Sequence, residues 1–123
     1  MITRLDKVTI YVKSQDEAMK FWIDKVGFAL TFEQPMGPNM TWIEVAPKGE
    51  HLASLVLYSR EAMQQQNPAM VAHPSLIFSA TDVEGTWKSM KAKGIEVPEI
   101  QSFPYGKVFN FKDQDGNLYL VRE

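Results

Sequence analysis

The sequence contains no cysteine, and this absence excludes disulfide bonds, thiolate zinc sites and cysteine nucleophiles. A chain of 123 residues with 45% hydrophobic and 23% charged residues can nevertheless bury a core without covalent cross-links. The absence of cysteine is also compatible with a reducing compartment. The composition is that of an ordinary globular domain.

Long apolar runs and an excess of positive charge are missing as well. The amino terminus "MITRLDK" lacks the apolar core of a signal peptide, so we expect neither secretion nor a membrane span, and a cytoplasmic location. The formal net charge is −2, and the lysines of "KSMKAKG" are spaced as on a solvated helix face. We therefore expect no nucleic acid and no membrane among the partners.

Common catalytic motifs are absent too. There is no Gly-x-Ser-x-Gly elbow, no glycine-rich phosphate loop and no His-Glu-x-x-His motif. Asp113 and Asp115 lie in the turn sequence "DQDG", where carboxylates are expected to accept hydrogen bonds from backbone amides rather than to transfer protons.

The first half of the chain predicts a β-α-β-β-β unit. Residues 5–12 alternate, with Val8, Ile10 and Val12 on one face and Lys7, Thr9 and Tyr11 on the other. The segment "SQDEAMKFWIDKVG" predicts a helix that is capped by Ser14 and ends at Gly27. Three strand-like runs follow, "FALTFEQ", "MTWIEVA" and "HLASLVLY", separated by turn-forming residues.

The second half repeats this pattern. The segment "SLIFSATDVEGTWKSMKAKGIEV" predicts a strand and a helix, with Asp82 as the cap and Gly94 as the stop. The strands "EVPEIQSF", "GKVFNFKD" and "NLYLV" follow. Lys7 corresponds to Ser75 and Ser14 to Asp82 at one constant offset, so an internal repeat explains the two halves best.

Between the halves lies "SREAMQQQNPAMVAHP", which is long for a connection inside a compact domain. We predict one domain over residues 1–123, with a first module at about 3–60, a linker at about 61–73 and a second module at about 74–123. One helical turn is expected at "REAMQQQ". Four methionines lie in this linker or in an earlier turn, either as an adaptable pocket mouth or as surface filler: Met36, Met40, Met63 and Met70.

The tandem repeat, with "FWIDKVGF" after the first strand and "FKDQDGNLYLV" at the end, resembles the vicinal oxygen chelate superfamily. This superfamily includes glyoxalase I, the extradiol dioxygenases and the bleomycin and fosfomycin resistance proteins. The resemblance covers nearly the whole chain. It implies an α+β fold with two curved, mixed four-stranded sheets that line a cleft, and usually a homodimer.

Enzymes of this superfamily hold a divalent metal with ligands from the first and last strands of each module. The resemblance places these positions at Lys7, Ser75, Leu120 and a residue near Ser54 or Val56. An ammonium group repels a metal ion, a leucine offers no lone pair, and a serine hydroxyl binds such ions weakly. We therefore expect no metal and no other cofactor. A rescue by His51 and His73, together with a carboxylate such as Glu44, stays open as the alternative.

Strand parity predicts which residues face the cleft. They are Lys7, Thr9, Tyr11, Trp42, Glu44, Ser54, Val56, Ser75, Ile77, Ser79, Asn110, Leu120 and Arg122. Lys7 would hold a ligand carboxylate or phosphate, act as a base through a lowered pKa, or pair with Glu44. Trp42 would be either part of the core or a stacking platform for a planar ligand.

These features favour a metal-independent small-molecule-binding protein with a planar or anionic ligand. The alternative is an enzyme, a glyoxalase-like lyase or a dioxygenase, whose metal ligands are displaced or which works through Lys7. A third hypothesis is a structural or partner-binding domain with a filled cleft. The residues alone leave the question of catalysis open.

Overall fold

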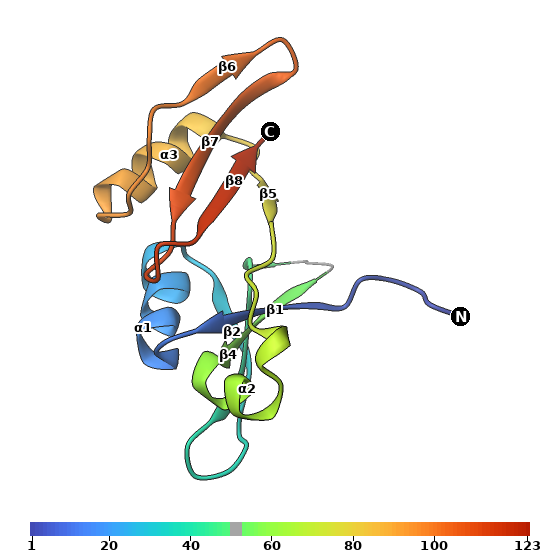
Figure 1. The fold of residues 1–123 in the computed structure, drawn as a ribbon. Coiled ribbons are helices and arrows are strands. Elements are labelled where there is room, and N and C mark those ends of the chain that lie inside the picture. The colour runs from blue at the N-terminus through green and yellow to red at the C-terminus, as the bar shows by residue number, and fades with distance from the viewer. Residues whose placement is uncertain (50–52) are drawn as a thin grey trace. The chain divides into compact units, whose positions relative to one another are not determined.

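The computed structural model describes residues 1–49 and 53–123. The chain divides into two compact units, Met1–Pro74 and Ser75–Glu123, and each contains one four-stranded sheet (Figure 1). The predicted α+β class and the tandem β-α-β-β-β order are confirmed. In the described residues, no helix is long and apolar enough to cross a membrane.

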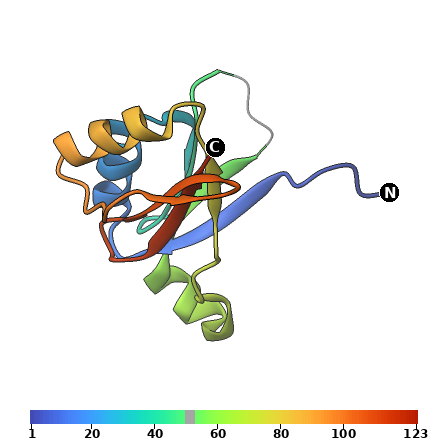
Figure 2. The same ribbon diagram turned by 90° about the horizontal axis from the view of Figure 1, so that it is seen from above.

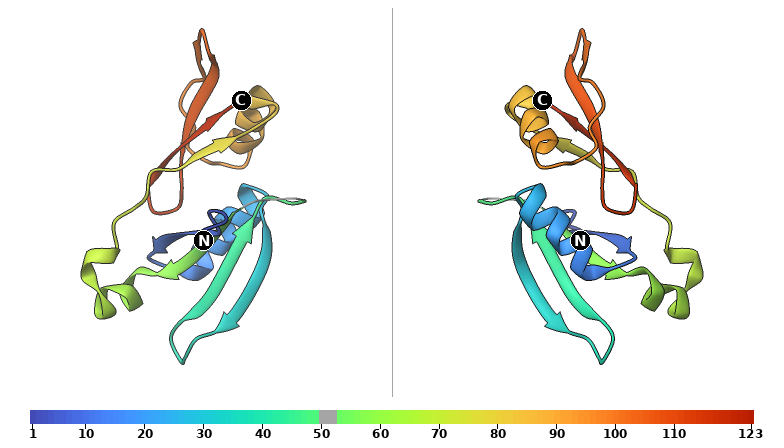
Figure 3. Two further views of the ribbon diagram at one scale, coloured as in Figure 1. Left: turned by 90° about the vertical axis from the view of Figure 1, so that its right-hand side faces the viewer. Right: turned by 90° about the vertical axis from the view of Figure 1, so that its left-hand side faces the viewer.

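The sheet of the first unit contains β1 (Lys7–Val12), β2 (Ala29–Pro35), β3 (Thr41–Ala46) and β4 (Ser54–Ser59). The strand order is β1-β4-β3-β2, in which β1 is parallel to β4 and the other neighbours are antiparallel. The β2–β3 hairpin forms one edge of this sheet (Figure 3).

Helix α1 (Gln15–Met19) begins where predicted, because the Ser14 Oγ accepts a hydrogen bond from the Glu17 N–H at 3.2 Å. The helix then widens into the π-helical turn η1 (Lys20–Lys25), in which the neighbouring residues Phe21 and Trp22 are both buried. A single α-helix up to Gly27 was therefore the wrong expectation. Gly27 ends the element with a φ of 93°.

The core of the first unit lies on the β1 face that carries Ile10 and Val12, as the alternation predicted. The buried side chains Trp22, Val45 and Leu57 come from the neighbouring elements. Helix α2 (Arg60–Gln66) occupies the predicted turn at "REAMQQQ" and packs against β1 and β4 (Figure 2). The 3₁₀ turn η2 (Pro68–Met70) follows it.

The second unit contains β5 (Ile77–Ser79), α3 (Val83–Ala92), β6 (Gln101–Phe103), β7 (Gly106–Lys112) and β8 (Leu118–Arg122). It repeats the arrangement of the first sheet, with the strand order β5-β8-β7-β6. Strand β6 is shorter than the predicted run at 96–103, which contains Pro98, a residue without a backbone N–H for a sheet ladder. Buried Phe109, Phe111 and Tyr119 fill the core beside Val83 and Met90.

Candidate functional site

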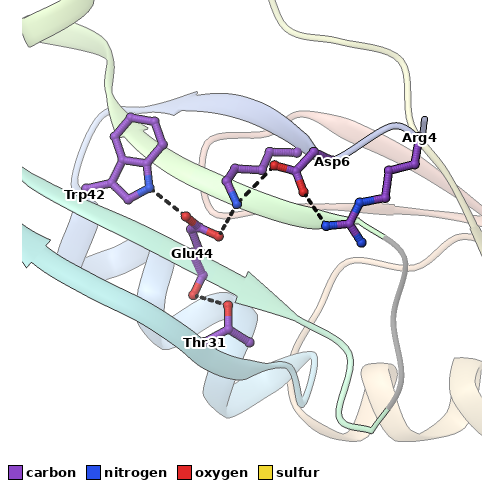
Figure 4. A network of polar contacts seen from close by, with 6 residues as sticks. Arg4, Asp6, Thr31, Trp42 and Glu44 are labelled. Atoms are coloured by element: carbon purple, nitrogen blue, oxygen red, sulfur yellow. Dashed lines mark hydrogen bonds and ion pairs between the residues drawn. The ribbon is translucent and has the colours of Figure 1, made fainter. Parts of the chain in front are cut away.

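A polar network lies on one face of the first sheet, around Glu44 of β3 (Figure 4). The β1–β4 register pairs Lys7 with Ser54 and Thr9 with Val56, and Glu44 pairs with Val56 from the other side. Directly paired residues share a face of a sheet. The structure therefore brings together the predicted candidates of the first unit, which are Lys7, Thr9, Tyr11, Trp42, Glu44, Ser54 and Val56.

Glu44 is the most buried carboxylate of this network, with 8% of the residue exposed. Its two oxygens have different donors: Oε1 accepts from the Lys7 ammonium at 3.0 Å and Oε2 accepts from the Trp42 indole N–H at 2.8 Å. Both contacts are charge-assisted hydrogen bonds, which are stronger than neutral ones. They fix the carboxylate and the indole relative to each other.

Lys7 is paired rather than poised for proton transfer. Its ammonium also lies 3.5 Å from a carboxylate oxygen of Asp6, which in turn pairs with Arg4 at 3.1 Å. The hydrogen bond to Glu44 raises the pKa of Lys7, so the side chain is protonated at neutral pH. The expected ion pair with Glu44 is confirmed, and the hypothesis of a base with a lowered pKa is wrong.

A β-bulge in β2 supports Glu44 from the adjacent strand. The pairing of β2 with β3 shifts between Leu30 and Phe32, and the Thr31 hydroxyl donates to the Glu44 carbonyl at 3.1 Å. No residue pattern indicates this bulge, because the run "FALTFEQ" fits an ordinary strand. Thr31, Asp6 and Arg4 belong to the network around Glu44, and strand parity did not identify them.

An aromatic cluster adjoins the network on the same face. Tyr11, Val56 and Tyr58 are buried, and partly buried Met40, Trp42, Ala62 and Met63 pack against them. The rings of Trp42 and Tyr58 meet edge to face, with centroids 6.0 Å apart. Trp42 packs in this cluster, and part of its surface stays accessible. Stacking of a planar ligand on this ring stays a prediction. Tyr58 was missed, although it has the same strand parity as Ser54 and Val56.

Gln15 holds the sheet where β3 and β4 separate. These strands pair at Glu44 with Val56 and at Val45 with Leu55. The Gln15 amide donates to the carbonyls of Thr41 at 2.6 Å and Leu57 at 2.8 Å. This bridge replaces missing ladder bonds beside Trp42 and Tyr58, so the aromatic cluster rests on a fixed backbone.

The second-unit candidates lie on their own sheet. The register pairs Leu120 with both Ile77 and Asn110, and Ser79 with Arg122, so these residues share one face. Ile77 is 63% exposed, whereas the Asn110 amide donates to the Tyr119 carbonyl at 3.1 Å. Ser75 precedes β5 and is exposed. Contact of these residues with a ligand stays a prediction.

The side chains present do not fit the divalent metal that the resemblance implies. Lys7 places an ammonium at one ligand position, and Leu120 places an alkyl group at another. Over residues 1–49 and 53–123, no group of three or more His, Asp or Glu side chains is close enough to hold an ion. His51, which the alternative site requires, lies outside the described residues.

The ion pair predicts unequal effects of its two partners on stability. Lys7→Met leaves the Glu44 side chain, which is only 11% exposed, without its cationic donor, and we expect the free energy of unfolding to fall by about 1–3 kcal/mol. Glu44→Gln should cost less, because the Lys7 side chain is 38% exposed and can be hydrated. The double variant should recover part of the loss in urea unfolding. Strictly additive effects would show that the two groups are not coupled.

The family model that matches residues 4–120 is that of the Glyoxalase/Bleomycin resistance protein/Dioxygenase superfamily. The chain therefore belongs to this superfamily.

The chain is also similar to individual proteins and solved structures. The uncharacterized protein YetH of Bacillus subtilis (strain 168) is 40% identical over the full length of both chains. Among solved structures, TnmS3, an antibiotic binding protein from Streptomyces sp. CB03234, is 28% identical with a TM-score of 0.82, over 98% of this chain and 95% of that chain. Lactoylglutathione lyase from Agrobacterium tumefaciens, at 18% identity and a TM-score of 0.72 over 99% and 94%, shares the fold.

Proposed function

We propose that this protein is a metal-independent binder of small molecules, and that the face of the first sheet with Lys7, Trp42 and Glu44 contacts the ligand. One observation carries the proposal: the Lys7 ammonium, at a position where family enzymes place a metal ligand, forms a 3.0 Å hydrogen bond with Glu44. A cation in this position disfavours a second, divalent cation by direct repulsion.

The surface beside the ion pair has the composition of a small-molecule site. Trp42, Met40 and Met63 are partly exposed apolar side chains next to a few polar groups. The similarity to the antibiotic binding protein TnmS3 supports binding as the function. The proposal includes a cytoplasmic location, which the absence of cysteine supports. It also includes a homodimer, since members of the superfamily usually form one.

The alternative is a lyase or dioxygenase with displaced metal ligands, and metal content separates it from a binder. The protein would be dialysed against nickel, zinc, manganese and iron in turn and examined by elemental analysis. We expect far less than one metal per chain. Lys7→His, which places an imidazole beside Glu44, should retain more metal than the natural chain.

One tightly held metal per chain in the natural protein would contradict the proposal and favour the enzyme. The binding function itself predicts that a ligand raises the melting temperature without added metal. A ligand at a hundred times its dissociation constant stabilises the folded state by about 2.7 kcal/mol.

A further inference from the structure

The charges of the network limit what kind of ligand this face can accept. The Glu44 carboxylate neutralises the Lys7 ammonium at 3.0 Å, and Asp6 and Arg4 form a second pair at 3.1 Å. An anionic ligand would have to compete with Glu44 and Asp6 for the ammonium. A cationic ligand would meet the same ammonium as a like charge. The network formed by these four groups therefore offers no unpaired counter-ion to an anionic or a cationic ligand.

The same groups still offer hydrogen bonds. An ammonium has three donors, and the Lys7 side chain is 38% exposed, so one donor remains for a ligand beside the contacts with Glu44 and Asp6. Each Glu44 oxygen accepts one hydrogen bond in the network and has a second lone pair. A donor and an acceptor therefore lie next to each other on this face.

The apolar part of the surface combines a fixed aromatic ring with adaptable side chains. The Trp42 indole is fixed by its bond to Glu44 and by its edge contact with Tyr58. The thioethers of Met40 and Met63, which flank the cluster, can adjust to the outline of a ring. An aromatic molecule can lie here with its polar group directed at the ion pair.

We propose that this face selects neutral planar molecules with an adjacent hydrogen-bond donor and acceptor, as in an aromatic carboxamide, over charged analogues of the same ring. This inference rests on the proposed binding function. It narrows the broader expectation of a planar or anionic ligand to neutral planar ligands, because the positive charge of Lys7 is already compensated.

The test uses three probes with one ring system: 2-naphthamide, which is neutral, 2-naphthoate, which is anionic, and 2-naphthylmethylammonium, which is cationic. Calorimetry gives the affinities at neutral pH. The NMR signal of the Trp42 indole N–H, assigned with Trp42→Phe, reports the place of binding. The natural protein should bind 2-naphthamide at least about tenfold more tightly than either charged probe.

If the Lys7–Glu44 ion pair causes the preference for neutral ligands, Glu44→Gln should weaken the preference for 2-naphthamide over 2-naphthoate. Gln preserves an acceptor for Trp42 and leaves the Lys7 charge without its main partner, so 2-naphthoate should gain about tenfold relative to 2-naphthamide. Glu84→Gln is the matched control, because it removes the carboxylate of the Lys107–Glu84 ion pair in the second unit and changes the net charge equally. It should leave the selection unchanged.

The possible failures are distinguishable. If 2-naphthoate binds the natural protein as tightly as 2-naphthamide and shifts the Trp42 signal, the proposed binding face is supported. The inference that this face selects neutral ligands is then wrong. If Glu44→Gln behaves like Glu84→Gln, the ion pair does not set the selection. If no probe shifts the Trp42 signal, both this inference and the proposed binding face are wrong.

Discussion

Replacement of Asp113 by alanine should lower the free energy of unfolding by about 3–5 kcal/mol. Asp113 is 6% exposed, and its carboxylate accepts four hydrogen bonds. The donors are the backbone amides of Asp115 and Asn117, the Asn117 side chain, and the Tyr119 hydroxyl at 2.6 Å. Alanine leaves these groups without their acceptor, and Tyr119 is only 1% exposed.

The free-energy cost of Asp113→Ala is large because water cannot reach all of the donors that have lost the carboxylate. A buried donor without an acceptor retains its full desolvation penalty, about 1–3 kcal/mol for each group. Tyr119→Phe is the matched comparison, because it removes one donor and leaves the backbone contacts of Asp113 in place. We expect this change to cost about 1 kcal/mol.

Urea unfolding of both single variants and of the double variant measures these effects. Asp113→Ala should lower the free energy of unfolding by less in the Tyr119→Phe background, because the hydroxyl that loses its acceptor is then absent. A loss below about 1 kcal/mol for Asp113→Ala alone would show that the turn between β7 and β8 rearranges to satisfy its amides in another way.

The sequence predicted most of this architecture because its signals are local. The alternation in β1 identifies the face on which Ile10 and Val12 are buried, and the position of Ser14 identifies the start of α1. The expectation that Asp113 accepts hydrogen bonds from turn amides is confirmed by the amides of Asp115 and Asn117. These features depend on residues that are close together in the chain.

Features that depend on distant partners were harder to predict. The bond from Thr31 to Glu44 requires a bulge, and the bridge from Gln15 to Thr41 and Leu57 requires that β3 and β4 separate. Neither event leaves a pattern in the residues themselves. The Lys7–Glu44 pair was among the hypotheses because both residues had the same strand parity, but only the structure shows that Trp42 binds the same carboxylate.

The buried hydroxyl of Tyr119 also makes the stability of the protein sensitive to alkaline pH. Burial and the hydrogen bond to Asp113 raise the pKa of Tyr119 far above its ordinary value of 10.0. Above about pH 10, the unfolded chain releases the phenolic proton of Tyr119, whereas the folded chain retains it. The unfolded state then binds fewer protons, so the free energy of unfolding falls as the pH rises.

The expected slope from Tyr119 is about 1.4 kcal/mol for each pH unit above 10. Lys7 and Lys107 act in the same direction, because hydrogen bonds to Glu44 and Glu84 raise their pKa above 10.5 and their stabilising effect is lost as the pH rises further. Both lysines are present in Tyr119→Phe, so the difference between the natural protein and this variant isolates the phenol. In urea unfolding, the natural protein should lose its advantage of about 1 kcal/mol over this variant within about one pH unit above 10. It should then become the less stable of the two by pH 12, since phenylalanine has no proton to retain. Parallel pH profiles would mean that the Tyr119 hydroxyl ionises as readily in the folded state as in the unfolded one.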